Sequence, residues 1–254
     1  ANGKSGIDRY ALVSRNHPHI TAFDSLASFS VGNGEFAFTA DITGLQTFPA
    51  RYSKGVPLGT QAQWGWHSFP NPEGYKHHET LKNYNFRGKE EPYSVQFNEP
   101  GRQQEAANWF RVNPHRLHLG TVGFEIRNLS DIHSPDQTLD MWEGVLYSKF
   151  VYQSQSVEVQ TAADPHQDAV GTYVKGTRLP SLNFRFPYPT GGHADDACNW
   201  DSPGRHRTEV IASTSTKVVL ARTLDASRYY VTISWEGKAR FEQKEAHYYV
   251  LIPE

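Results

Sequence analysis

Residues 229–236 read Tyr-Tyr-Val-Thr-Ile-Ser-Trp-Glu, and this octet decides the fold class. Large apolar side chains alternate in it with mostly polar ones, and a period of two places the two sets on opposite sides of a strand. The octet therefore predicts a half-buried β-strand whose inward face includes Val231, Ile233 and Trp235. Gly237-Lys238 follows as a turn, after which Ala239–Phe241 is expected to pair back as a hairpin.

Similar alternation recurs along the chain, mostly in its second half and at short spacing. It predicts about ten strands in all, of which the others cover Phe36–Ile42, Val122–Ile126, Gly144–Tyr152, Ser156–Ala162, Ala169–Val174, Ser181–Phe186, Val210–Thr214, Lys217–Arg222 and His247–Ile252. Helical signals are confined to Gln103–Phe110 and, more weakly, to Phe23–Phe29. Closely spaced strands favour antiparallel sheets packed as a large sandwich over a βαβ fold, which needs helices between its strands.

Composition restricts the classes of function. The 254 residues include 25 Lys and Arg against 27 Asp and Glu. This near balance argues against a nucleic-acid or anionic-membrane partner, because phosphate binding depends on clustered positive charge. The single cysteine, Cys198, excludes an internal disulfide and a cysteine-ligated zinc site. No apolar run approaches the length of a membrane-spanning helix.

One domain is expected over residues 1–254, because no Pro/Gly/Ser-rich linker divides the chain. The segment Pro49–Gly101 differs from the rest, since it is rich in aromatic residues and has no sustained period. A long irregular stretch of this kind is typical of a functional loop or of a segment that covers another surface.

Three stretches, taken in order, resemble a known family. They are Ser30–Phe38 (SVGNGEFAF) with Asp41–Phe48 (DITGLQTF), then Thr138–Leu146 (TLDMWEGVL) with the turn Asp164–Asp168 (DPHQD), and lastly Leu182–Phe186 with the closing strands Tyr229–Trp235 and His247–Ile252. This set is similar to the N-terminal β-supersandwich domain that precedes the (α/α)6 barrel in bacterial six-hairpin glycoside hydrolases. The α-L-fucosidase and the maltose or trehalose phosphorylase families have such a domain.

The resemblance implies an all-β fold, a large antiparallel β-supersandwich of the galactose-mutarotase-like type with few short helices. It implies two partners, an oligo- or polysaccharide and a downstream helical barrel of the same polypeptide, together with a periplasmic or secreted location. Relatives carry their general acid on that barrel, whereas this sequence stops at Glu254. We therefore expect the non-catalytic N-terminal domain of a longer glycosidase, which lends a loop to the substrate cleft, has no cofactor and is inactive alone.

The segment Gln61–His67 (QAQWGWH) carries the residues that we expect to contact a sugar. Indole rings stack on the C–H faces of pyranoses, amides and imidazoles bond their hydroxyls, and glycine lets the backbone approach a ligand closely. The expected substrate-binding residues are Gln61, Gln63, Trp64, Trp66 and His67. The other interpretation places both tryptophans in the core or against the barrel, since Trp is also enriched at protein interfaces.

Carboxylates offer no specific catalytic assignment. Glycoside hydrolysis by the usual route needs two of them flanking the scissile bond. Most turn carboxylates only bond local N–H groups. The candidates at predicted strand ends or turns are Glu35, Asp41, Glu143, Asp164 and Asp168.

Several clusters of histidine and acidic residues are candidate metal ligands, but no metal site is expected. The candidate clusters are His77-His78-Glu79, His115 with His118, and His193 with Asp195 and Asp196. His115 and His118 would face opposite sides of an extended strand. Two alternatives stay open: a self-contained aldose-epimerase-like enzyme, which would need a Glu base and a His acid, and a stand-alone carbohydrate-binding module.

Overall fold

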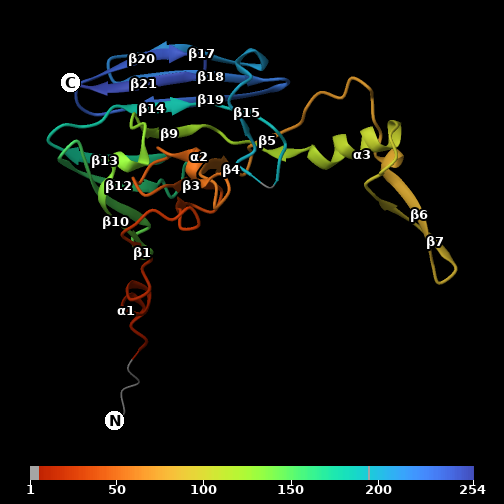
Figure 1. The fold of residues 1–254 in the computed structure, drawn as a ribbon, viewed down its shortest axis with the longest axis horizontal. Coiled ribbons are helices and arrows are strands. Elements are labelled where there is room, and N and C mark those ends of the chain that lie inside the picture. The colour runs from red at the N-terminus through yellow and green to blue at the C-terminus, as the bar shows by residue number, and fades with distance from the viewer. Residues whose placement is uncertain (1–5, 194) are drawn as a thin grey trace, which may run out of the picture.

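A computed structural model describes residues 6–193 and 195–254, and strands dominate its regular structure (Figure 1). The strands are β1 (His19–Ile20), β2 (Phe29–Gly32), β3 (Phe36–Ala40), β4 (Gly59–Ala62), β5 (Trp66–His67), β6 (Leu81–Phe86), β7 (Lys89–Ser94), β8 (His115–Arg116), β9 (Thr121–Phe124), β10 (His133–Asp140), β11 (Val145–Tyr152), β12 (Gln155–Ala163), β13 (Val170–Gly176), β14 (Leu182–Arg185), β15 (Tyr188–Pro189), β16 (Cys198–Asn199), β17 (His206–Ser213), β18 (Lys217–Leu224), β19 (Ser227–Ser234), β20 (Ala239–Glu245) and β21 (Tyr248–Pro253).

The helices are few and short, as expected. The α-helices are α1 (Arg9–Ser14), α2 (Pro49–Tyr52) and α3 (Arg102–Val112), and the 3-10 helices are η1 (His77–Thr80), η2 (Leu129–Asp131) and η3 (Pro203–Arg205). Helix α3 confirms the helix predicted over Gln103–Phe110. None of the helices in the described part of the chain has the length and apolar character needed to span a bilayer.

The strands form antiparallel sheets in layers, which confirms the all-β sandwich class. Four larger sheets have the strand orders β1-β10-β11-β12-β13, β20-β21-β14-β9, β17-β18-β19 and β2-β3-β4. In Figure 1 the blue strands β17–β21 lie above the green strands β10–β13, with the orange strands β3 and β4 on the near side of the lower layer. Every pairing among the described strands is antiparallel.

Two apolar clusters fill the space between these layers. Alternation along β11 turns Leu146 and Phe150 inward, where they join Phe38 of β3 and Phe124 of β9 in the larger cluster. The second cluster lies between β17-β18-β19 and β20-β21-β14-β9, and it contains Ile233, with Val231 and Trp235 packed against it. The inward face predicted for residues 229–236 is therefore confirmed.

Three sequence-based predictions are wrong. The described residues form 21 strands where about ten were expected, and five of the strands are only two residues long. Ala239–Phe241 does not pair back on the preceding strand, because β20 pairs with β21 and β19 pairs with β18. The turn at Gly237 (φ +86°) carries the chain from one sheet to another instead of closing a hairpin. Residues 23–28 form no helix, because the Asp24 side chain accepts the N–H of Leu26 in a local turn.

The segment Pro49–Gly101 is more regular than expected. It contains α2, β4, β5 and η1 as well as the hairpin of β6 and β7, and the hairpin and α3 extend away from the sandwich (Figure 1). Tyr84, Phe86 and Tyr93 lie on one face of this hairpin, and all three are exposed. An isolated two-stranded hairpin is only marginally stable in water, so this face suits a surface that another element covers.

Candidate functional site

A tightly tied loop joins β4 to β5 and carries both tryptophans of the segment Gln61–His67. The N–H of Gly65 donates to the Ala62 carbonyl at 2.9 Å, and that of Trp66 donates to the Trp64 carbonyl at 2.8 Å. Arg116 on β8 closes the loop from outside, since its Nη1 donates to the carbonyls of Ala62 and Gln63, each at 2.9 Å. A Cβ at Gly65 would lie 3.1 Å from the Ala62 oxygen, which explains the glycine.

Strand alternation in β5 sends neighbouring side chains to opposite sides. Trp66 is 48% exposed, whereas His67 is only 2% exposed. The register of β5 with β8 places Arg116 opposite Trp66 and His115 opposite His67. The Arg116 guanidinium lies 4.3 Å from the centre of the Trp66 ring, at the distance of a cation–π contact.

Trp64 points toward a different neighbourhood, although it is as exposed as Trp66. Its Nε1–H donates to Asp168 at 2.7 Å. The Asn33 amide donates to the carbonyls of Asp164 and Gln167, both at 3.0 Å. The structure thus brings the tryptophan loop together with the Gly-Asn-Gly turn and the Asp164–Asp168 turn, two of the stretches that carry the family resemblance.

An open groove of about 720 Å³ lies beside Trp66. Strands β3, β4, β5 and β8 contribute Thr39, Gln61, Trp66 and Arg116 to its lining. Helix α3 and the chain around residues 191–197 contribute further polar side chains, namely Arg111, His193, Asp195 and Asp196. Buried His115 and His118 complete the polar lining, so the groove combines one exposed indole with many hydrogen-bonding groups.

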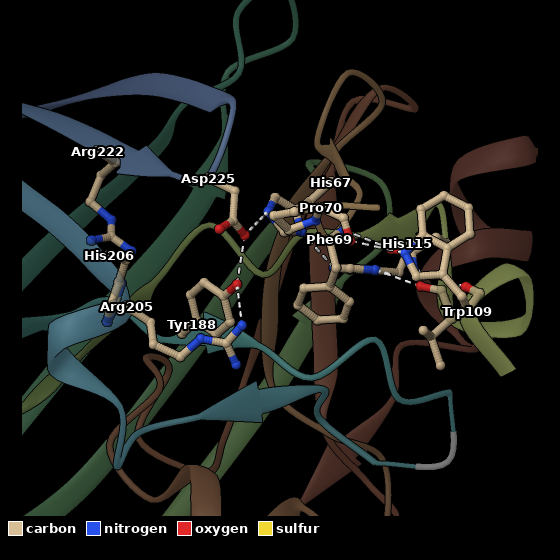
Figure 2. A network of polar contacts seen from close by, with 12 residues as sticks. His67, Phe69, Pro70, Trp109, His115, Tyr188, Arg205, His206, Arg222 and Asp225 are labelled. Atoms are coloured by element: carbon tan, nitrogen blue, oxygen red, sulfur yellow. Dashed lines mark hydrogen bonds and ion pairs between the residues drawn. The ribbon is translucent and has the colours of Figure 1, made fainter. Parts of the chain in front are cut away.

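A chain of polar contacts begins at His115, which lines the groove, and passes through buried His67 (Figure 2). His115 Nδ1 lies 2.7 Å from the Val112 carbonyl, and His115 Nε2 lies 3.0 Å from His67 Nδ1. His67 Nε2 lies 3.1 Å from Asp225 Oδ2, which also accepts the Tyr188 hydroxyl at 2.6 Å. Arg205 donates to the Tyr188 oxygen at 3.0 Å. The chain joins residues from α3, β5, β8, β15, η3 and the turn that follows β18.

The proton count of this network is constrained. A carbonyl only accepts, so His115 Nδ1 carries a proton, and the Nε2 of neutral His115 then accepts from His67. His67 then donates from Nδ1, and it can also donate from Nε2 to the Asp225 carboxylate only if it binds a second proton. Burial lowers the pKa of His67 and of His115, while Asp225 offsets part of this effect at His67. Complete hydrogen bonding of the network therefore requires a third proton, which burial makes harder to acquire.

A second buried cluster surrounds Arg222, whose side chain is fully buried. Its Nη2 lies 2.8 Å from His206 Nδ1, and its Nη1 donates to Thr208 Oγ1 at 2.6 Å. Burial, Arg222 and stacked His247 lower the pKa of His206 to about 3, so its ring stays neutral and accepts. Among the described residues no carboxylate pairs with this guanidinium, and neutral acceptors surround it instead. The residues of this cluster are not among those that line the groove.

The five residues expected to bind substrate fall into three places. Gln61 and Trp66 line the groove, and Gln63 and Trp64 are exposed on the adjoining loop. His67 lies beneath, in the buried network, so a ligand in the groove meets His115 rather than His67. The exposure of both tryptophans removes the interpretation that they belong to the core.

The other sequence candidates divide between the core and the groove. Asp41 is fully buried; burial raises its pKa to about 6, and it accepts hydrogen bonds from Thr43 and from the N–H of Phe48. His115 and His118 both line the groove, because β8 ends at Arg116 and the chain bends before His118. Within the described residues, no group of three or more His, Cys, Asp or Glu side chains is arranged to hold a metal ion.

Comparison with known proteins finds matches among solved structures but not among family models or curated proteins. No family model matches the sequence, and no curated protein matches it. A solved structure described as "Putative kojibiose phosphorylase from human microbiome" is similar to this chain with a TM-score of 0.49 and 8% sequence identity. The similarity covers 93% of this chain and 29% of that chain, so this chain spans less than a third of the length of the solved one.

Proposed function

We propose that this chain is a carbohydrate-binding, non-catalytic β-sandwich domain of a glycoside-processing enzyme. The observation that carries the proposal is the exposed indole of Trp66 on a loop that Arg116 fixes, at a groove lined with hydrogen-bonding side chains. A pyranose has an apolar C–H face for such a ring and hydroxyls for the polar groups around it. The fixed loop reduces the entropy lost on binding.

The buried histidines of the groove favour binding over acid–base chemistry. His118 has its Nε2 3.3 Å from the Leu58 carbonyl, and its Nδ1 accepts the Gly120 N–H at 3.1 Å. Both nitrogens of His115 are engaged as well. A general acid or base must reach its substrate with a free nitrogen. This is why we prefer a binding module to a self-contained epimerase.

We further propose that the chain is the N-terminal domain of a periplasmic or secreted six-hairpin glycosidase. In that enzyme it would pack against a downstream helical barrel. Exposed Tyr84, Phe86 and Tyr93 on the β6/β7 hairpin support such packing, because aromatic faces of this kind are typical of surfaces that are covered in an assembly. In that enzyme the loop with Trp64 and Trp66 borders the substrate cleft.

Calorimetry with a panel of oligosaccharides tests the binding function. We expect at least one to bind with Trp66 in contact, so Trp66→Ala should abolish binding while the thermal midpoint barely moves. Trp142→Ala is the matched control, since Trp142 is also 48% exposed but does not line the groove. Binding that survives Trp66→Ala, or no binding to any sugar, would overturn the proposal.

The barrel partner needs a separate experiment. The chain, expressed with the sequence that follows it in the natural reading frame, should show glycosidase or phosphorylase activity that the 254 residues alone lack. Turnover by the isolated chain that a single carboxylate substitution removes would contradict the non-catalytic assignment.

A further inference from the structure

Arg116 is held in one orientation at the edge of the groove. Both hydrogens of its Nη1 are used by the carbonyls of Ala62 and Gln63, and the guanidinium plane is fixed further by its contact with the Trp66 ring. The N–H groups of a guanidinium lie in its own plane, and the two Nη1 hydrogen bonds orient that plane. The remaining donors of Arg116 therefore have a defined direction.

Those remaining donors are the Nε–H and Nη2 groups, which form one edge of the fork. Over residues 6–193 and 195–254, neither group makes a hydrogen bond and no carboxylate lies within ion-pair distance of Arg116. Arg111 on α3 also lines the groove without a carboxylate partner in that part of the chain, and its Nη2 lies 3.5 Å from His193. Two guanidinium groups thus line the groove without an ion-pair partner in that part of the chain.

The free edge of a guanidinium matches a carboxylate, because two parallel N–H groups meet two oxygens. We propose that the sugar bound in this groove is acidic, a uronic acid whose carboxylate pairs with the Nε/Nη2 edge of Arg116 while its ring lies against Trp66. The inference rests on the proposed function and names the ligand class of the same groove.

The carboxylates of the groove fit this ligand as well. Asp195 accepts the N–H of Ala197 at 2.9 Å, and Asp196 accepts the N–H of Cys198 at 3.2 Å, so local turns hold both side chains. Burial and neighbouring Asp195 raise the pKa of Asp196. Sugar hydroxyls donate to such oxygens. A uronic acid therefore presents its anionic edge to Arg116 and its hydroxyls to the acidic part of the groove.

Calorimetry compares an oligogalacturonide and an oligoglucuronide, each with its carboxyl-reduced neutral form and with a sulfated oligosaccharide. We expect one acidic ligand to bind at least tenfold more tightly than its reduced form, and its affinity to fall as salt rises. Arg116→Lys keeps the charge but loses the fork and the loop contacts, so it should weaken acidic binding about tenfold more than it weakens neutral binding. Arg111→Gln, which leaves the loop contacts intact, should weaken acidic binding as well.

Arg228→Gln is the matched control, because exposed Arg228 also lies over an aromatic ring, that of Tyr230, but outside the groove. Equal binding of acidic and reduced ligands, or preference for the sulfated one, overturns the uronic-acid inference while Trp66-dependent sugar binding stands. No binding of any sugar overturns the proposed function itself.

Discussion

Replacing His118 by glutamine removes a histidine that the fold keeps neutral. The side chain is 7% exposed, with Nε2 3.3 Å from the Leu58 carbonyl and Nδ1 accepting the Gly120 N–H. Burial lowers the pKa of His118 from 6.5 to about 4, because the imidazolium would lose its hydration there. A glutamine amide can donate to Leu58 and accept from Gly120, so the substitution keeps both partners but cannot titrate.

The sign of the effect follows from proton linkage. The folded pKa of His118 lies below the unfolded value, so the unfolded chain binds this proton first and stability falls as pH falls from about 7 to 4. With 1.36 kcal/mol for each unit of pKa difference, the loss from this residue is about 2 kcal/mol at pH 5 and about 3 kcal/mol at pH 4.

Urea unfolding of wild type and His118→Gln at pH 7.5, 5 and 4 measures this loss. Between pH 7.5 and 5, the free energy of unfolding of the wild type should fall by about 2 kcal/mol more than that of His118→Gln. His193→Gln is the control, because the His193 side chain is exposed. If wild type and His118→Gln lose stability in parallel as pH falls, the argument from burial is refuted.

Three further substitutions test the interior. Thr43→Val removes the 2.6 Å hydrogen bond to the buried Asp41 carboxylate and should lower the free energy of unfolding at pH 7 by about 1 to 3 kcal/mol. Arg222→Met orphans several buried acceptors, so we expect a loss of about 3 kcal/mol in urea unfolding, and nitrogen NMR should show the pKa of His206 rising from about 3. Phe150→Ala should cost about 3 to 5 kcal/mol in the same unfolding assay, because the ring is fully buried against Phe124.

Local periodicity explains which strands could be predicted. The β11, β12 and β18 segments alternate because one face of each is buried, and that pattern is visible in any window of the sequence. Strand partners are not local. The turn at Gly237 looks like a hairpin turn, yet it connects two sheets, and only the packing of both sheets decides this. The sequence did not predict the β6/β7 hairpin, because both strands are mostly exposed, so burial imposes no alternation on them, and β7 contains Pro92.

Some features of the candidate site could also be predicted from the sequence, and others could not. Exposure of Trp64 and Trp66 could be anticipated, because indoles flanking a glycine in a polar context suit a surface loop. The buried network could not, since His67, His115 and Asp225 are separated by 48 and 158 residues in its two contacts. Arg116 also carries no signal in the sequence, because its role depends on the carbonyls of a loop that is distant along the chain.

The pairing of β5 with β8 links the groove to the interior. Two residues on each strand make two contacts: the exposed pair of Trp66 with Arg116, and the buried pair of His67 with His115. A slip of one residue would exchange the two faces and bury the groove side chains. The buried network resists that slip, because His67 and His115 are both tied to fixed acceptors on other elements. His67 therefore acts on the groove by fixing the register of β5, which is how a residue without access to ligand determines where Trp66 lies.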